Sequence, residues 1–121
     1  MEILIVDDDV AVRESEKKIL ERAGFTVETA GNGLAAFAEL QQRTFAAMVC
    51  DIRMPFLDGK GFYEQVEEFF PDIANRTIFV TGFAAEDDTR RFLESSGQPF
   101  LEKPVELVEL VDAVRKMVEK G

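Results

Sequence analysis

The sequence predicts an α/β protein built on a doubly wound parallel sheet of five strands. Short apolar runs recur along the 121 residues, and each is followed by a segment whose apolar residues return every three or four positions. Strand-like and helix-like segments therefore alternate, which is typical of a parallel sheet covered by helices on both faces. A chain of this length suits one domain, so we expect residues 1–121 to form a single domain.

The first half of the chain reads as strand, helix, strand, helix, strand. The first helix places its apolar side chains on one face and ends at Gly24, a residue type favoured just after helices. Asn32 and Gly33 then turn the chain into the second helix. The supporting segments are the strand runs 2–6, 25–29 and 46–50 and the helical apolar positions Val12, Ile19, Leu20, Ala23, Leu34, Phe37 and Ala38.

The second half repeats this cycle. A helix ends before Pro71, a strand covers residues 77–80, and a helix over residues 85–95 is closed by Gly97. A short fifth strand at 100–101 leads into the final helix. The apolar positions of the first and last of these helices are Phe62, Val66, Phe69 and Phe70, and Leu107, Leu110, Val111, Val114 and Val118.

The compositions of the strands also order the sheet. Strands 2–6, 46–50 and 77–80 are continuously apolar, as expected of strands buried on both faces, whereas 25–29 alternates and 100–101 is short. The first, third and fourth strands are therefore central, and the second and fifth are edges. With right-handed crossovers this gives the strand order 2-1-3-4-5, the flavodoxin-like arrangement.

Composition and charge exclude several classes of protein. With 46% hydrophobic and 31% charged residues the chain is ordinary for a globular domain, and no apolar stretch approaches the roughly 18 residues of a membrane span. A net charge of −10 without histidine argues against a nucleic-acid surface and removes histidine as base, zinc ligand or phosphate carrier. Met1 leads directly into a strand, so we expect a cytoplasmic protein without membrane contact. Cys50, the single cysteine, is expected to be a small buried hydrophobic residue.

Five polar side chains follow four of the predicted strands. Asp7 and Asp8 come after the first strand, Asp51 after the third, Thr81 after the fourth and Lys103 after the fifth. Open α/β sheets bind ligands outside the carboxyl ends of their strands, so we expect these side chains to form one site. Crowded carboxylates repel one another, and a divalent cation with oxygen ligands removes that repulsion.

These residues resemble those of a bacterial response-regulator receiver domain, and the resemblance covers the whole chain. The matching motifs, in order, are Asp7-Asp8, Asp51-Ile52-Arg53-Met54-Pro55, Asp58-Gly59, Thr81-Gly82, and Phe100 three positions before Lys103-Pro104. The resemblance implies a phosphoacceptor switch of a two-component or phosphorelay system, partnered by a sensor histidine kinase or a phosphotransfer protein. It also implies that the protein is not an enzyme acting on external substrates, although such domains assist their own phosphorylation and autodephosphorylation.

The resemblance also assigns the chemistry of the acidic residues. Asp51 is implied to accept the phosphoryl group from a phosphohistidine. Asp7, Asp8 and Asp51, together with the main-chain carbonyl of Arg53, are implied to hold Mg²⁺. The metal would neutralise the crowded carboxylates and stabilise the charge of the phosphoryl group during transfer.

Three further residues are implied to bind the phosphoryl group or to change conformation when it is present. Lys103 would pair with the Asp51 carboxylate and then with its phosphoryl group, and Thr81 would bond a phosphoryl oxygen. In such domains the hydroxyl at the Thr81 position moves toward the phosphate, and an aromatic ring then rotates inward into the freed space. That ring belongs to Phe100 here, where a tyrosine is frequent. The surface of the fourth helix, fifth strand and fifth helix then changes, and phosphorylation-linked dimerisation would use this surface. The fourth helix has few large apolar residues to hold it in one place.

Each site residue also has an ordinary structural interpretation. Asp9 is expected to cap the first helix, and Asp58-Gly59 taken alone would be a turn. The peptide bond between Lys103 and Pro104 is cis in domains of this kind, whereas sequence alone gives only a modest preference for that isomer. The joint placement of the motifs at strand ends is what favours the functional interpretation.

Other function classes use a comparable sheet edge. A Mg-dependent aspartate-nucleophile phosphatase of the haloacid-dehalogenase type also uses a strand-end Asp, Thr and Lys, but it needs a second acid where this chain has Arg53. A flavin-binding flavodoxin-like carrier shares the strand order, but Asp7, Asp8 and Asp9 would repel its cofactor phosphate. A degenerate receiver used only for docking is disfavoured because every phosphorylation residue is present.

Two features distinguish this chain from a general receiver pattern. Arg53 and Phe83 should both flank the phosphoryl group. We expect Phe83 to screen the acyl phosphate from water. Arg53 could either shield the phosphate or orient water toward it, so we predict neither a longer nor a shorter phosphate lifetime from this residue. The stretch 92–104 is similar to receivers at the carboxyl end of hybrid sensor kinases. We therefore expect either a single-domain regulator or a receiver from a longer protein, and the second is favoured.

Overall fold

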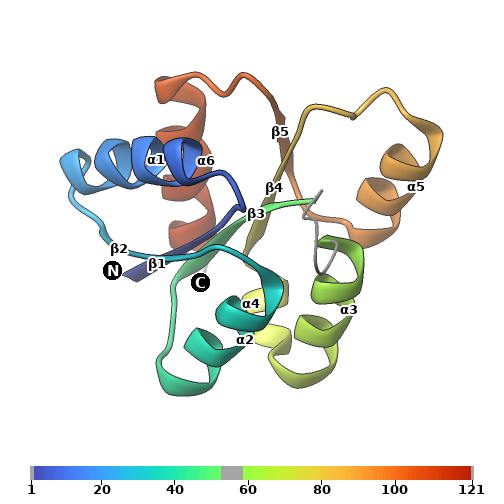
Figure 1. Ribbon diagram of the computed structural model, residues 1–121, viewed down its shortest axis with the longest axis horizontal. Helices are drawn as coiled ribbons and strands as arrows, with labels where there is room; N and C mark the ends of the chain where they lie inside the picture. The colour runs from blue at the N-terminus through green and yellow to red at the C-terminus, as the bar shows by residue number, and fades with distance from the viewer. Residues whose placement is uncertain (1, 53–58, 121) are drawn as a thin grey trace.

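A computed structural model describes residues 2–52 and 59–120. Its centre is a five-stranded parallel sheet in the order β2-β1-β3-β4-β5 (Figure 1), so the doubly wound class and the strand order are confirmed. The strands are β1 (Glu2–Val6), β2 (Thr26–Ala30), β3 (Ala47–Asp51), β4 (Thr77–Thr81) and β5 (Phe100–Glu102). The helices are α1 (Val10–Arg22), α2 (Gly33–Gln42), α3 (Gly59–Phe69), α4 (Pro71–Ala74), α5 (Asp87–Ser96) and α6 (Leu107–Lys120).

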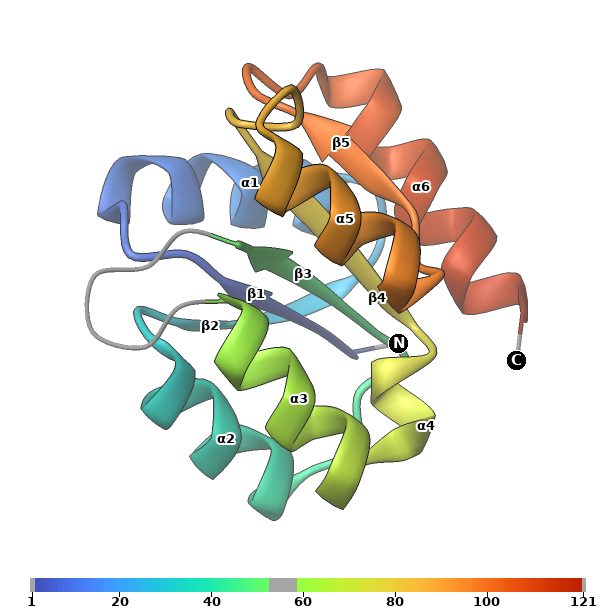
Figure 2. The same cartoon turned by 90° about the vertical axis from the view of Figure 1, so that its right-hand side faces the viewer.

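Helices cover both faces of the sheet (Figure 2), with α1 and α6 against one face and α2 to α5 against the other. Alternate residues of β1 serve the two layers: Ile3 and Ile5 pack with α1 and α6, and Leu4 and Val6 pack on the opposite side. All four side chains are at most 1% exposed. Burial on both faces explains the unbroken apolar runs of β1, β3 and β4, since any polar side chain there would be desolvated.

The two edges of the sheet carry the less buried strands, as predicted. In β2, Thr26 is exposed while Val27 is buried, and in β5 Phe100 is 43% exposed. The edge position of β5 matters for function because the chain leaves this strand directly into Lys103.

Side-chain caps begin two helices close to the carboxyl edge of the sheet. The Asp9 carboxylate accepts hydrogen bonds from the main-chain N–H groups of Ala11 (2.9 Å) and Val12 (3.2 Å), which confirms its predicted role as the N-cap of α1. Asn32 caps α2 in the same way through the N–H of Ala35 at 2.8 Å. These caps hold the loops after β1 and β2 in defined positions.

Strand ends and one short helix differ from the sequence prediction. The second to fifth strands each end one residue later than expected. The backbone ladder continues through Ala30, paired with Val6, through Asp51, paired with Val80, and through Thr81, paired with Glu102. The one-turn helix α4 was not predicted. The ladder fixes the backbones of Asp51 and Thr81, so both side chains start from rigid positions.

Within residues 2–52 and 59–120, no helix is both long and apolar enough to span a bilayer.

Candidate functional site

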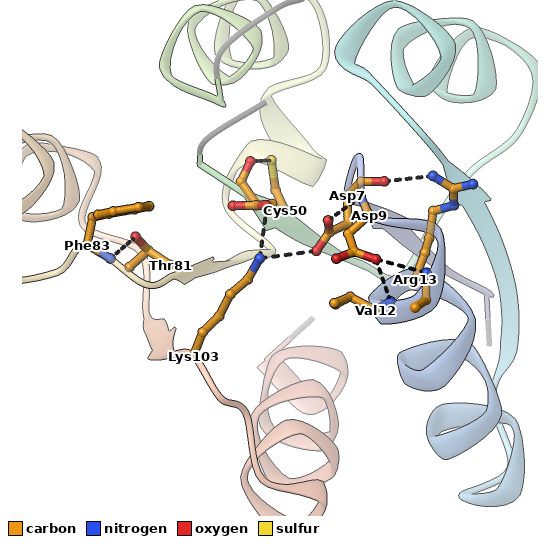
Figure 3. Close-up of polar contacts among 10 residues, drawn as sticks. Asp7, Asp9, Val12, Arg13, Cys50, Thr81, Phe83 and Lys103 are labelled. Atoms are coloured by element: carbon orange, nitrogen blue, oxygen red, sulfur yellow. Dashed lines mark hydrogen bonds and ion pairs between the residues drawn. The ribbon is translucent and has the colours of Figure 1, made fainter. Parts of the chain in front are cut away.

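Asp7, Thr81 and Lys103, three of the predicted site residues, lie at the carboxyl edge of the sheet (Figure 3). The Lys103 ammonium donates a hydrogen bond to Asp51 Oδ2 at 3.0 Å and lies 3.6 Å from Asp7 Oδ2. The chain segments after β1 and β5 and the end of β3 are thereby joined through charged side chains. Three of the five polar residues expected at this edge are therefore in direct contact.

An acidic cluster surrounds this contact. Carboxylate oxygens of Asp7, Asp8 and Asp51 all lie within 4.8 Å of one another. Burial raises the pKa of Asp7; the N–H of Asp9, at 2.9 Å, and the Lys103 charge oppose this rise, while the charges of Asp51 and Asp8 reinforce it. The single ammonium of Lys103 does not balance the negative charge of three carboxylates.

The donor set of this cluster fits a hard divalent cation. Asp7 and Asp51 are 2% and 6% exposed, whereas Asp8 is exposed and gives the cluster an open side. Carboxylate oxygens on a partly open, electron-rich site are the ligands that Mg²⁺ prefers. Arg53, whose carbonyl was expected to complete the set, and Asp58 lie outside the described residues.

Lys103 is held in its charged form. Burial alone would lower the pKa of its ammonium, but the hydrogen bond and charge of Asp51, and then the charges of Asp7 and Glu16, raise it overall. Its main-chain N–H donates to the Thr81 carbonyl at 2.8 Å, and the following peptide bond to Pro104 is cis. A protonated amine is therefore present at Asp51 throughout the neutral range.

Thr81 ends β4 with its side chain 1% exposed. Its hydroxyl oxygen accepts a hydrogen bond from the Phe83 N–H at 2.9 Å, which leaves the hydroxyl proton available to another acceptor. The phenyl ring of Phe83 lies beside Thr81 (Figure 3) and is 43% exposed. Phe100, expected to respond to Thr81, begins β5 and is also 43% exposed.

Arg13 supports the loop that carries the acidic pair, a role that the sequence analysis missed. Its Nη1 donates to the Asp7 carbonyl at 2.9 Å. A Cβ at Gly31 would come within 2.9 Å of the same Nη1, so the absence of a side chain there makes room for the guanidinium. An arginine within the first turn of a helix that follows an acidic loop is a signal that could have indicated this contact.

Glu16 is a second residue that sequence reasoning missed. Although it is an acid, its side chain is only 6% exposed, inside the apolar face of α1. Burial first, and then the charge of Asp7, raise its pKa to about 7, while Lys103 opposes this shift. Its position four residues after Val12 and four before Leu20 places it on the buried face, which is the signal that could have found it.

Cys50 is fully buried, as expected. Burial, followed by the charges of Asp51 and Asp7, raises the pKa of its thiol far above the ordinary range. The thiol therefore stays protonated and serves as a small hydrophobic side chain, despite its place next to Asp51.

The fold and the site together define a class of protein. A buried aspartate at the end of a central strand, a lysine ammonium in contact with it, two more acids and a nearby hydroxyl suit a divalent cation and a phosphoryl group. Their place at the carboxyl edge of a 2-1-3-4-5 sheet is where this fold binds its ligands.

Comparisons with known proteins agree with this class. The family model of the response regulator receiver domain matches residues 3–115, so the chain belongs to that family. It is 35% identical over 121 residues to the response regulator receiver protein CpdR of Brucella abortus (strain 2308), covering 96% of this chain and 95% of CpdR. It is 32% identical to the sensor kinase CckA of the same organism, covering 98% of this chain and 12% of CckA.

A solved structure shares the fold and part of the sequence. The response regulator receiver domain protein (CheY-like) from Methanospirillum hungatei JF-1 superposes with a TM-score of 0.89 at 30% identity, covering 98% of this chain and 94% of that one. The predicted family and fold are thus confirmed, and the chain is a receiver domain of the two-component signalling type.

Proposed function

We propose that Asp51 accepts a phosphoryl group from the phosphohistidine of a sensor histidine kinase or a phosphotransfer protein. The observation that carries this proposal is the contact of the Lys103 ammonium with Asp51 Oδ2 at 3.0 Å, inside a cluster of three carboxylates. Asp7, Asp8 and Asp51 are the residues that would hold Mg²⁺. The bound metal would supply positive charge to the phosphoryl oxygens.

The transfer is a displacement at phosphorus. A carboxylate oxygen of Asp51 attacks, the bond from phosphorus to the imidazole nitrogen breaks, and the imidazole leaves with the electron pair. The product is an acyl phosphate on Asp51. Lys103 supports this step because its ammonium is already positioned at the reacting carboxylate and can pair with the new phosphoryl oxygens without reorganisation.

The switch would run from Thr81 through Phe100 to the surface of α5, β5 and α6. The free hydroxyl proton of Thr81 can be donated to a phosphoryl oxygen. A cavity of about 490 Å³ between α5 and β5, lined by Gly82, Leu93 and Phe100 among others, offers room for the exposed Phe100 ring to turn inward. The changed surface is the one through which we expect a downstream partner or a second copy to bind.

Helix α5 suits movement in such a switch. Only Thr89 and Leu93 are buried along its ten residues, and Phe92 is a partly buried addition to the core. Little apolar surface therefore opposes a shift of the helix.

We also propose that residues 1–121 act as one receiver domain in the cytoplasm, without contact to nucleic acid or membrane. The family match over residues 3–115 and the net charge of −10 support this assignment. The domain would be a signalling element and not an enzyme with outside substrates, although it would assist its own phosphorylation and dephosphorylation.

Incubation with acetyl phosphate tests the proposed function. In the presence of Mg²⁺ the protein is expected to gain the mass of one phosphoryl group, measured by intact-protein mass spectrometry. With EDTA in place of Mg²⁺ the gain should be lost, because the crowded carboxylates then repel the incoming phosphate. No gain with Mg²⁺, or an equal gain with EDTA, would contradict the proposal.

The variant Phe83→Ala tests whether the phenyl ring shields the acyl phosphate. Loss of the ring beside Thr81 should admit water, so we expect the phosphorylated protein to decay severalfold faster than the wild type. Decay is followed by mass spectrometry after removal of the donor. Phe69→Ala, which removes an exposed ring on α3, is the control and should decay at the wild-type rate. Unchanged or slower decay of Phe83→Ala would refute the shielding role.

A further inference from the structure

A cavity of about 560 Å³ opens between α1 and the segment that links β5 to α6. Its walls are mainly apolar and include Val12, Ile19, Pro104, Val105 and Leu110. Volumes of this size hold small organic molecules in other proteins. The cavity lies next to the acidic cluster, since Lys103 lines it as well, but Asp7, Asp8 and Asp51 are not part of its lining.

Glu16 is the acidic residue in the lining of this cavity. The side chain is 6% exposed, and its carboxylate has no hydrogen bond or ion pair within the described parts of the chain. A carboxylate that has lost most of its contact with water is stabilised by protonation or by a cation. Burial first, and then the Asp7 charge, raise its pKa to about 7, while the Lys103 charge opposes this rise.

Among the described residues, two negative groups and one positive group shift the pKa of Glu16. Asp7 after β1 and Asp51 at the end of β3 are negative, and both raise the pKa of Glu16. Lys103 after β5 is positive, but its ammonium is held by Asp51 at 3.0 Å and by Asp7 at 3.6 Å. A cation that enters the cavity would therefore find the carboxylate of Glu16 among apolar lining residues.

We propose that this cavity binds a small organic cation with an apolar body, whose ammonium or amidinium group pairs with the Glu16 carboxylate. The apolar walls account for the body and the buried carboxylate for the charge. An organic anion would be repelled by the same carboxylates. A neutral molecule would fill the apolar part but leave Glu16 without a partner.

Three probes of nearly equal shape test this proposal: benzylamine, benzyl alcohol and benzoate. Each is titrated into the isotope-labelled, unphosphorylated chain at pH 8, without Mg²⁺ or phosphodonor, and amide chemical shifts are recorded by NMR. Benzylamine should give saturable shifts centred on α1 and residues 104–105. Benzyl alcohol should bind about tenfold more weakly, as expected for loss of one charged hydrogen bond, and benzoate should not bind.

Two matched variants on α1 test whether Glu16 supplies the carboxylate that pairs with the cation. Glu16→Gln should bind benzylamine about tenfold more weakly than the wild type and lose the preference for benzylamine over benzyl alcohol. Glu14→Gln carries the same change on the exposed face of the helix and should bind like the wild type. Equal binding of benzylamine to Glu16→Gln, shifts centred elsewhere, or no saturable binding of benzylamine would overturn the proposal. Because phosphorylation is not involved, this result is independent of the phosphoacceptor test.

Discussion

The variant Asp51→Asn is expected to gain no phosphoryl group from acetyl phosphate and Mg²⁺, whereas the wild type gains one. Asparagine has nearly the same size and can still accept the hydrogen bond from Lys103, so the local structure should persist. Its amide oxygen lacks the negative charge that makes a carboxylate a nucleophile, and the cluster loses one anionic metal ligand. We expect a loss below detection, measured by intact-protein mass spectrometry.

A second aspartate variant controls for the general effect of the substitution. Asp112→Asn changes an exposed residue of α6 and should be phosphorylated to the wild-type level. A circular dichroism spectrum identical to that of the wild type would show that Asp51→Asn is folded. If folded Asp51→Asn gains as much mass as the wild type, another side chain accepts the phosphoryl group and the proposed site is wrong.

The variant Glu16→Gln is expected to stabilise the metal-free protein at pH 8 by about 3 kcal/mol and to have little effect at pH 4. The folded-state pKa of Glu16 is about 7, raised from the ordinary 4.5 by burial and by Asp7. A raised pKa means that the folded state binds the proton more tightly than the unfolded state. The contribution of Glu16 to the stability of the wild type should therefore be greatest below pH 4.5 and be lost as pH rises through about 7.

Urea unfolding from pH 4 to pH 8 in EDTA measures this effect as the free energy of unfolding. Glutamine resembles the protonated acid, so the difference between Glu16→Gln and the wild type should grow across this range and then level off. Glu14→Gln removes the same charge from the exposed face of α1 and is the control. A difference between Glu16→Gln and the wild type that stays constant across this range would contradict the prediction.

Apolar patterning was sufficient to predict the sheet. Ile3 to Val6 and Ile78 to Val80 are buried on both faces, and only central strands of a parallel sheet need such runs. The strand order followed from composition and crossover handedness, and it is confirmed. The caps Asp9 and Gly97 were also predictable, because both act locally: Asp9 through side-chain hydrogen bonds to the first turn of α1, and Gly97 through its left-handed backbone conformation.

Strand ends were less predictable because side-chain polarity and backbone pairing are different properties. Asp51, Thr81 and Glu102 are polar, so the apolar runs stop before them. Their backbones nevertheless remain in the hydrogen-bonded ladder. The helical turn at Pro71 had a signal, since proline is favoured at the first position of a helix. Four residues are too few to show an apolar period.

At the site, the sequence could place the residues that belong to strand ends but not those that reach it from a helix. Asp7, Asp51 and Lys103 meet as predicted because the sheet brings strand ends together. Arg13 and Glu16 act through side chains on α1, and their contacts depend on how that helix packs against the sheet. Packing of this kind is a tertiary property that a local pattern does not contain.

The attachment of β5 to the sheet has a consequence for local unfolding. This edge strand has three residues, and the Lys103 side chain that follows it reaches past β4 to Asp51 on β3. The ammonium therefore holds the edge of the sheet to its centre, in addition to the backbone bond from Lys103 to Thr81. Any change in the charge on Asp51 alters this attachment, so amide hydrogen exchange at residues 100–103 reports directly on the state of a carboxylate two strands away.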